Sequence, residues 1–196
     1  MHRILGTPAG SHVLPPSRHR EEQEVRNAEQ VMTYIATTLR SAPDTPVTEG
    51  LIAQIHTLTT QEIAYRHNTP GEYRSHAVDA GAYKPPRTRD EISKLMREFA
   101  EWLNSPRTAS LPPAVRAIAA HFYFVSIHPF GDGNGRTARA IESYLLYQAR
   151  LNALGFYSLS NFYYLNRERY IELLNYTRFS SGGDLTPLLM FSLQGL

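Results

Sequence analysis

The chain has 196 residues, of which 42% are hydrophobic, and its formal net charge is +2. This composition is ordinary for a single globular domain and excludes a wholly disordered chain, while the lack of cysteine excludes disulfides, thiolate metal sites and cysteine nucleophiles. Because the chain has no dense basic block, no apolar stretch that could span a bilayer and no secretory signal, we expect a cytoplasmic protein that binds neither DNA nor a membrane.

Helical spacing of apolar residues dominates the sequence from residue 21 onward. Residues 1–20 carry Gly, Pro, Ser and His without periodicity, and we interpret them as a flexible N-terminal arm. Seven helices are predicted, over residues 21–40, from about 48, from the capping box at 88–91, and over 113–127, 134–150, 165–177 and 185–193. The helix over 113–127 is apolar almost all round, which predicts a buried position, and Pro129 ends it near His128.

Residues 68–87 interrupt the helical pattern with Gly, Pro, Tyr and Arg. An alternating patch at 73–78 and a glycine-containing segment at 81–83 predict a short β-hairpin there. The predicted fold class is therefore all-α, a helical bundle with one small β-hairpin at about 73–84.

A glycine-rich segment, H-P-F-G-D-G-N-G-R-T-A-R at 128–139, joins two of the predicted helices. A glycine turn that opens a helix exposes unpaired N–H groups, and these attract phosphates together with the positive end of the helix dipole. Arg136 and Arg139 are three residues apart, so they share a helix face and can clamp two phosphate groups.

Three further side chains of this segment fit nucleotide chemistry. Asp132 would repel a bare phosphate, so its place here is explained if it holds a divalent cation between phosphates. Asn134 can orient a phosphate oxygen as a neutral donor, and the usual pKa of histidine suits His128 to act as a general base at neutral pH. The segment therefore predicts phosphoryl or nucleotidyl transfer from a metal-bound nucleotide to a hydroxyl.

The same segment fits the pattern H-P-F-x-[DE]-G-N-G-R-x-x-R, the signature of the Fic (filamentation induced by cAMP) family, which the chain resembles over residues 21–196. P-G-E-Y-R-S at 70–75 and D-L-T-P at 184–187 resemble further stretches of Fic proteins. The resemblance implies a Fic-type catalytic domain, with a helical core and a β-hairpin flap over the active site. It also implies transfer of AMP from Mg²⁺-bound ATP to a Ser, Thr or Tyr hydroxyl of a target protein, with release of pyrophosphate.

The resemblance also implies roles for individual residues. His128 would deprotonate the target hydroxyl, and Asp132 would hold Mg²⁺. The residues implied to bind the nucleotide are Ser75, His76, Ala77 and Val78 in the flap, and Asp132, Gly133, Asn134, Gly135, Arg136, Thr137, Ala138 and Arg139 in the catalytic loop (residues 128–139). The target protein would join the edge of the flap as an additional strand.

A further short match concerns regulation. Many Fic proteins carry an inhibitory helix with the pattern [ST]-x-x-x-E-[GN], whose glutamate pairs with the second arginine of the motif, here Arg139. T-P-V-T-E-G at 45–50 matches this pattern, which makes Glu49 a candidate inhibitory residue. Two further partners are compatible with the family: an antitoxin-like protein that supplies the inhibitory helix, and a second copy in a homodimer.

Three alternatives to AMP transfer stay open from the sequence. Base selection lies outside the motif, so UMP or GMP could be the transferred group. Kinase-like transfer of phosphate is disfavoured because relatives with that activity alter the Gly-Asn-Gly-Arg part, which is intact here. The complete motif also disfavours a non-catalytic nucleotide-binding or interaction module. The sequence names neither the target protein nor the modified residue.

Overall fold

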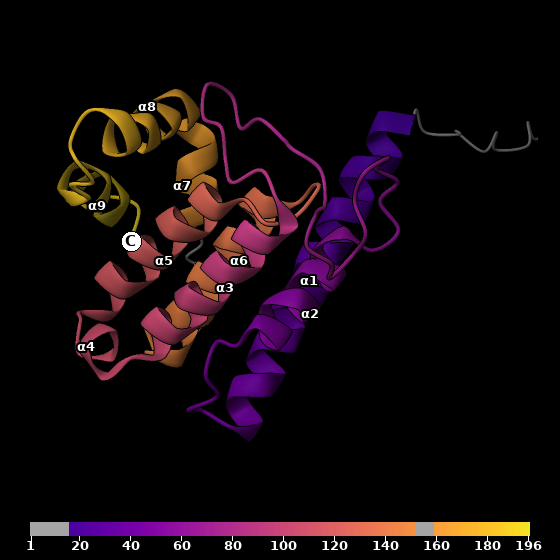
Figure 1. The fold of residues 1–196 in the computed structure, drawn as a ribbon. Helices are drawn as coiled ribbons and strands as arrows, with labels where there is room; N and C mark the ends of the chain where they lie inside the picture. The colour runs from indigo at the N-terminus through magenta and orange to yellow at the C-terminus, as the bar shows by residue number, and fades with distance from the viewer. Residues whose placement is uncertain (1–15, 152–158) are drawn as a thin grey trace, which may run out of the picture.

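A computed structural model describes residues 16–151 and 159–196, and Figure 1 shows their arrangement. The helices are α1 Pro16–Ser41, α2 Glu49–Thr60, α3 Arg89–Asn104, α4 Pro106–Ala109, α5 Pro113–Ile127, α6 Asn134–Gln148, α7 Leu159–Leu165, α8 Arg167–Phe179 and α9 Thr186–Leu193. The predicted all-α class is confirmed. Within the described ranges, no helix combines the length and the hydropathy needed to cross a membrane.

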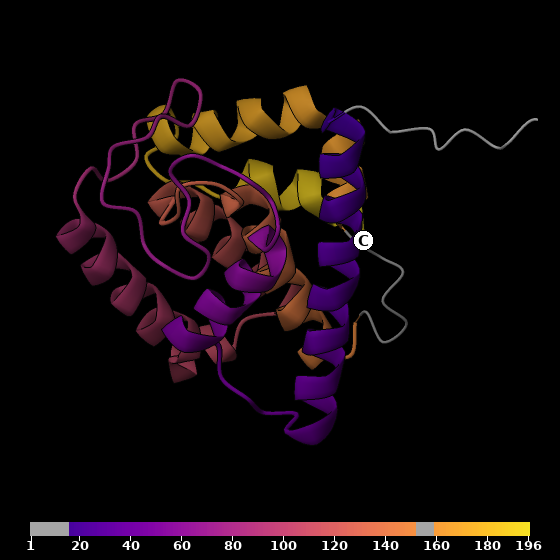
Figure 2. The same ribbon diagram turned by 90° about the vertical axis from the view of Figure 1, so that its right-hand side faces the viewer.

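Helix α6 occupies the middle of the bundle. It packs against α5 and also against α1 and α2, while α3 and α9 pack against α5. Figure 2, turned by 90°, shows α1 running along the outer edge of this arrangement. Helix α5 is buried over most of its length, as its apolar sequence predicts. The α5–α6 pair therefore fixes both ends of the segment that joins them, which carries the motif.

The starts of α2 and α3 are set by side chains that the sequence indicates. Thr88 and Glu91 form the predicted capping box at the start of α3, each bonding the other's backbone N–H. Thr48 caps α2, where its hydroxyl accepts a hydrogen bond from the Leu51 N–H. Each cap supplies a partner for N–H groups that the helix itself leaves unpaired.

Two predicted boundaries are wrong. Helix α1 begins at Pro16, so residues 16–20 are helical and not part of a flexible arm, which agrees with the preference of proline for the first turn. Residues 1–15 lie outside the described residues. The helix predicted over 165–177 is α8, shifted by two residues toward the C-terminus, and α7 before it was not predicted; the two helices meet at Asn166, where φ is −115° and ψ is 35°.

The β-hairpin predicted at 73–84 is reduced to a single antiparallel bridge. Ala80 and Tyr83 exchange two backbone hydrogen bonds of 2.9 and 3.2 Å, and no strand forms within the described ranges. The guanidinium of Arg74 binds two backbone carbonyls of this region, which removes them from any cross-strand ladder. Pro86 has no N–H to donate to such a ladder. We keep the name flap for residues 73–84.

Candidate active site

The catalytic loop rests on a stack of two rings. The fully buried Phe130 ring lies parallel to the His56 imidazole of α2, with centroids 3.6 Å apart. His56 Nε2 lies 3.0 Å from the Asp132 carbonyl oxygen, and its Nδ1 accepts a 2.9 Å hydrogen bond from the Gly71 N–H. Because a carbonyl only accepts, these contacts assign the His56 proton to Nε2. Burial lowers the pKa of His56 to about 4, so the ring is neutral at pH 7.

Asn134 braces the loop from inside. Its Oδ1 accepts a 2.9 Å hydrogen bond from the Phe130 N–H, and its Nδ2 donates a 2.8 Å bond to the Phe130 carbonyl. The residue is only 3% exposed. The prediction that the Asn134 side chain donates to a phosphate is therefore wrong, because its buried amide is directed at Phe130 and fixes the turn.

Two glycines are required where the loop passes close to other backbone and side chains. Gly133 has a φ of +75°, and a Cβ there would lie 2.5 Å from the Thr60 Cγ2. A Cβ on Gly131 would collide with the carbonyl group of His67. Gly133 is also the N-cap of α6 and supplies no side-chain cap, so the first N–H groups of α6 stay available to an anion.

His128 ends α5 in the left-handed conformation, with φ of 52° and ψ of 56°. Its Nδ1 lies 3.3 Å from the Val125 carbonyl oxygen, which assigns the ring proton to Nδ1 and leaves the lone pair on Nε2. Burial lowers the pKa of His128 to about 4, and the nearby charges of Arg74 and Arg178 act in the same direction. The imidazole is therefore neutral at pH 7 and can take a proton at Nε2.

Arg74 ties the flap to this end of the loop. The residue is 3% exposed, and its Nε donates a 2.8 Å hydrogen bond to the His128 carbonyl. Nη1 and Nη2 donate bonds of 2.7 Å to the carbonyls of His76 and Pro86. The Arg74 N–H adds a 2.9 Å bond to the Pro129 carbonyl. One guanidinium thus joins both ends of the flap to the catalytic loop.

A chain of charged groups links α1 to the other end of the loop. Asp132 Oδ2 lies 2.9 Å from Arg136 Nη2 and 3.1 Å from Arg20 Nη2 of α1. Glu24 Oε1 lies 3.0 Å from Arg136 Nη1 and 3.1 Å from Arg20 Nε. All four side chains keep part of their surface in solvent, so these ion pairs are weak enough for a charged ligand to displace.

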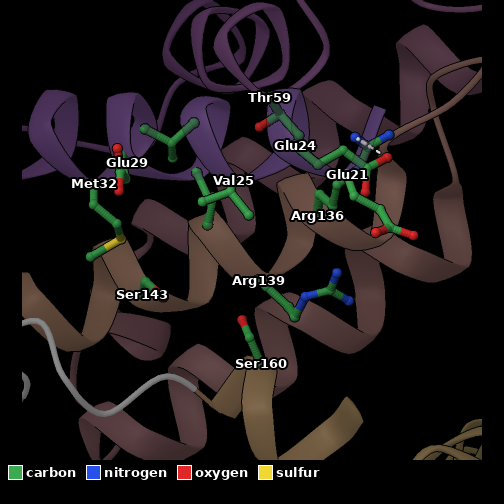
Figure 3. A pocket seen from close by; sticks show the side chains of 13 residues that line it. Glu21, Glu24, Val25, Glu29, Met32, Thr59, Arg136, Arg139, Ser143 and Ser160 are labelled. Atoms are coloured by element: carbon green, nitrogen blue, oxygen red, sulfur yellow. Dashed lines mark ion pairs between the residues drawn. The ribbon is translucent and has the colours of Figure 1, made fainter. Parts of the chain in front are cut away.

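Arg139 is the second arginine of the motif and has a different environment. With Arg136 it lines a cavity of about 680 Å³ between α1 and α6, shown in Figure 3. Burial lowers the pKa of Arg139, and no described residue forms a hydrogen bond or ion pair with its guanidinium. A half-buried cation without an acceptor is costly, and an anionic ligand would supply that acceptor.

The remaining predicted nucleotide residues fall into two groups. In the flap, Ser75 and Ala77 are exposed, whereas His76 and Val78 are half-buried, so the flap offers alternate side chains to the interior. In α6, Thr137 and Ala138 are fully buried, which directs their side chains into the core and away from a phosphate. The predicted part of Thr137 and Ala138 in nucleotide binding stays a prediction, and their burial leaves it to their backbone groups.

The predicted inhibitory contact of Glu49 is also wrong in this structure. Thr48 caps α2, which places Glu49 in the first turn of that helix. There the Glu49 carboxylate accepts a 2.8 Å hydrogen bond from the Tyr73 hydroxyl of the flap, and it does not pair with Arg139.

The side chains beside the loop fit a magnesium ion only if phosphates complete its coordination. No group of three or more His, Asp or Glu side chains within the described ranges could hold a metal by itself. Asp132 is a single carboxylate at the start of a helix that attracts phosphates, and both of its ion pairs fall on Oδ2. One carboxylate plus phosphate oxygens is a usual environment for Mg²⁺.

The residues that sequence reasoning missed act through the backbone. His56, Arg74 and Arg178 hold carbonyl groups of the loop or of the turn before it. Arg74 lies inside a stretch already noted for its resemblance to the family, which was a usable signal. For His56 and Arg178 no local pattern marks the contact, because it joins segments far apart in the sequence.

A family model described as the Fic/DOC family matches residues 46–146, and the chain belongs to that family. The curated relative "Protein adenylyltransferase Fic" from Aedes aegypti is 32% identical over 171 residues, which is 87% of this chain and 32% of that protein. The chain thus spans about a third of the length of this relative.

Two solved structures extend the comparison to the fold. A Fic family protein from Desulfovibrio desulfuricans G20 matches with a TM-score of 0.74 and 27% identity, over 98% of this chain and 53% of that one. A structure described as IbpAFic2 covalently tethered to Cdc42 matches with a TM-score of 0.51 and 18% identity, over 71% of this chain and 50% of that one. The second likeness is one of fold alone.

Proposed function

We propose that this chain is the catalytic part of a protein adenylyltransferase, which transfers AMP from Mg²⁺-bound ATP to a Ser, Thr or Tyr hydroxyl of a target protein. The observation that carries the proposal is one loop that has a neutral base, His128, at one end and at the other Arg139, an arginine with no acceptor among the described residues. The name of the Aedes aegypti relative supports the same activity.

His128 is suited to be the general base. Its Nε2 lone pair takes the proton of the target hydroxyl while the hydroxyl oxygen forms a bond to the α-phosphorus of ATP. The bond from that phosphorus to its bridging oxygen breaks, and pyrophosphate leaves. Because Nδ1 already faces the Val125 carbonyl, the ring presents only Nε2 to the substrate.

The start of α6 is suited to hold the phosphates. Its uncapped N–H groups, including those of Gly135 and Arg136, and the positive end of the helix dipole would bind phosphate oxygens. Arg139 would contact the distal phosphates, and Arg136 would exchange Glu24 for a phosphate oxygen. Asp132 would hold Mg²⁺, which neutralises charge on the phosphates when bound.

The flap is the surface we propose for the target protein. Residues 74–83 run beside the loop, and within the described part of the chain the N–H groups of residues 75–79 form no backbone hydrogen bond, so an extended target segment could add its own hydrogen bonds there. The IbpAFic2 structure was captured tethered to a protein, Cdc42, which is compatible with a protein target. The cytoplasmic location, the antitoxin-like partner and the homodimer stay predictions.

Two radiolabelled nucleotides test the proposal directly. Purified protein, Mg²⁺ and host lysate are incubated with ATP labelled on the α-phosphate or on the γ-phosphate, beside a His128→Ala control. Label that enters protein only from the α-position, and is lost in the variant, is the expected result. Label from the γ-position would replace the proposal with a kinase-like activity. Labelling by α-labelled UTP or GTP in place of ATP would change the transferred group.

A further inference from the structure

Arg178, near the end of α8, reaches the end of α5, immediately before the catalytic loop. Its Nε donates a 3.1 Å hydrogen bond to the Ser126 hydroxyl, and its Nη2 donates a 3.2 Å bond to the Val125 carbonyl. The last four carbonyls of a helix lack intrahelical partners, and a cation at that end is favourable. No described residue forms an ion pair with Arg178, so its charge is directed at this helix end.

The carbonyl that Arg178 holds is the one that His128 uses. Val125 O lies 3.3 Å from His128 Nδ1, and a carbonyl oxygen has two lone pairs, so it can accept from both residues at once. His128 is a non-glycine residue in the left-handed region, a conformation that persists only where its surroundings hold it. A fixed acceptor at Val125 therefore sets both the ring orientation and the nitrogen that carries the proton.

Arg178 also contacts the flap. Its guanidinium carbon lies 4.1 Å from the centroid of the Tyr83 ring, within the range of a cation–π interaction. The neighbouring Phe179 ring lies 6.0 Å from Tyr83, so the end of α8 meets the bridge of the flap through two side chains. Figure 1 shows the flap passing beside α8.

We propose that Arg178 is a positioning residue for nucleotidyl transfer, which orients His128 through the Val125 carbonyl and couples that orientation to the flap through Tyr83. This role rests on the proposed function for its effect on turnover, but the contact with His128 can be measured without any reaction. Arg178 does not line the cavity that contains Arg136 and Arg139, so it affects the base and not the phosphates.

The kinetic test compares Arg178→Met with Arg169→Met, an exposed arginine on the same helix. We expect Arg178→Met to lower kcat by roughly tenfold to a hundredfold, with KM for Mg²⁺-ATP changed less than about twofold. Arg178→Lys should recover part of kcat. The fall in kcat should be larger in Tyr83→Leu than in Tyr83→Phe, because the phenyl ring of the second variant still faces the cation. A fall in kcat no larger than that of Arg169→Met, or an equal rise in KM, would overturn the proposal.

The pH profile gives a readout that a merely structural role would not move. The charged groups that act on His128 are Arg74 of the flap, Arg178 of α8 and Asp132 of the loop. Because Arg178 is a cation, its removal raises the pKa of His128, so the acid limb of kcat should move to higher pH in Arg178→Met. An unmoved acid limb with an intact fold would contradict the coupling.

Nuclear magnetic resonance of ¹⁵N-labelled histidine separates this inference from the proposed function. The His128 signal, assigned by its loss in His128→Ala, should report the Nδ1–H tautomer in the wild type and a mixture of tautomers in Arg178→Met. An unchanged tautomer and pKa would overturn the role of Arg178 even if AMP transfer is found. If the tautomer and the pKa of His128 both change but the wild type transfers no AMP, the positioning of His128 by Arg178 is supported and the proposed function is rejected.

Discussion

The two ends of the catalytic loop are held by arginines of different kinds. At the His128 end, Arg74 and Arg178 donate to backbone carbonyls, which are neutral and permanent acceptors. At the α6 end, Arg136 is paired with the carboxylates of Asp132 and Glu24, and Arg139 has no acceptor among the described residues.

This difference indicates two roles for the arginines: those at the His128 end support the base, and those at the α6 end bind the nucleotide. An arginine that donates to a backbone carbonyl keeps this acceptor when a ligand binds, so it can hold a base in one orientation. An arginine on a half-exposed carboxylate can exchange it for a phosphate oxygen at little cost. We therefore expect changes at the His128 end to affect turnover, and changes at the α6 end to affect nucleotide binding.

The largest expected effect is that of His128→Ala on transfer. A positioned general base contributes roughly a hundredfold to ten-thousandfold to a rate. We expect a loss of that size in the initial rate of α-label transfer, with the melting temperature close to that of the wild type. A variant that keeps more than a tenth of the rate would show that the base lies elsewhere.

The second effect is on stability, because the buried His56 and the half-buried His128 are both neutral rings at pH 7. Their folded pKa values of about 4 lie below the usual 6.5 of an unfolded histidine, so the unfolded state binds more protons. The contribution of these two histidines to the free energy of unfolding is thus complete above pH 6.5 and is lost as the pH falls toward 4. We expect a loss on the order of 2 kcal/mol per histidine between pH 7 and pH 5.

Urea unfolding at a series of pH values measures this loss. His56→Gln, which keeps an amide able to face the Asp132 carbonyl, should show a shallower dependence over the same range. An equally steep dependence in that variant would mean that groups other than His56 cause the loss of stability at low pH.

The third effect concerns Arg139→Gln. A charge-assisted hydrogen bond is worth about 1.5–3 kcal/mol, so the affinity for Mg²⁺-ATP should fall roughly tenfold to a hundredfold. The affinity for AMP should fall much less, because the distal phosphates are the proposed partners of Arg139. Arg97→Gln on the exposed face of α3 is the control, and titration calorimetry with both nucleotides is the measurement. Equal losses for the two nucleotides would contradict the assignment.

The smallest effect is expected for Glu24→Gln. Its ion pair with Arg136 is partly exposed and worth up to about 1 kcal/mol, so its removal should tighten Mg²⁺-ATP binding by roughly twofold to fivefold. Glu22→Gln, two residues before Glu24 on α1 and exposed, should leave the affinity unchanged. Weaker binding in Glu24→Gln would show that Glu24 supports Arg136 in the bound state instead of competing with the nucleotide.

Local patterns predicted most of the fold. The capping box at Thr88 and the apolar run that forms α5 are local features, and both appear as expected. The hairpin was overestimated because alternation alone does not show that Arg74 takes up carbonyls of that region. Helix α7 was missed, since its seven residues are too few to show a helical period in the sequence.

The site was predictable to the extent that its motif is contiguous. The positions of His128, Arg136 and Arg139 follow from their spacing around a helix start. Two contacts were not predictable: the hydrogen bond between the Asn134 amide and Phe130, and that between Glu49 and Tyr73. Each depends on the packed geometry of the loop or of the flap. The contacts of Arg20 and Glu24 depend on how α1 crosses α6, which no local pattern encodes.

The most direct test of this division of roles is the affinity of His128→Ala for Mg²⁺-ATP, measured by titration calorimetry. If the His128 end serves only the chemistry, the variant binds Mg²⁺-ATP within about twofold of the wild type, although its rate of AMP transfer falls by roughly a hundredfold or more. A loss of affinity comparable to that of Arg139→Gln would contradict the account, because it would make His128 part of the phosphate-binding end.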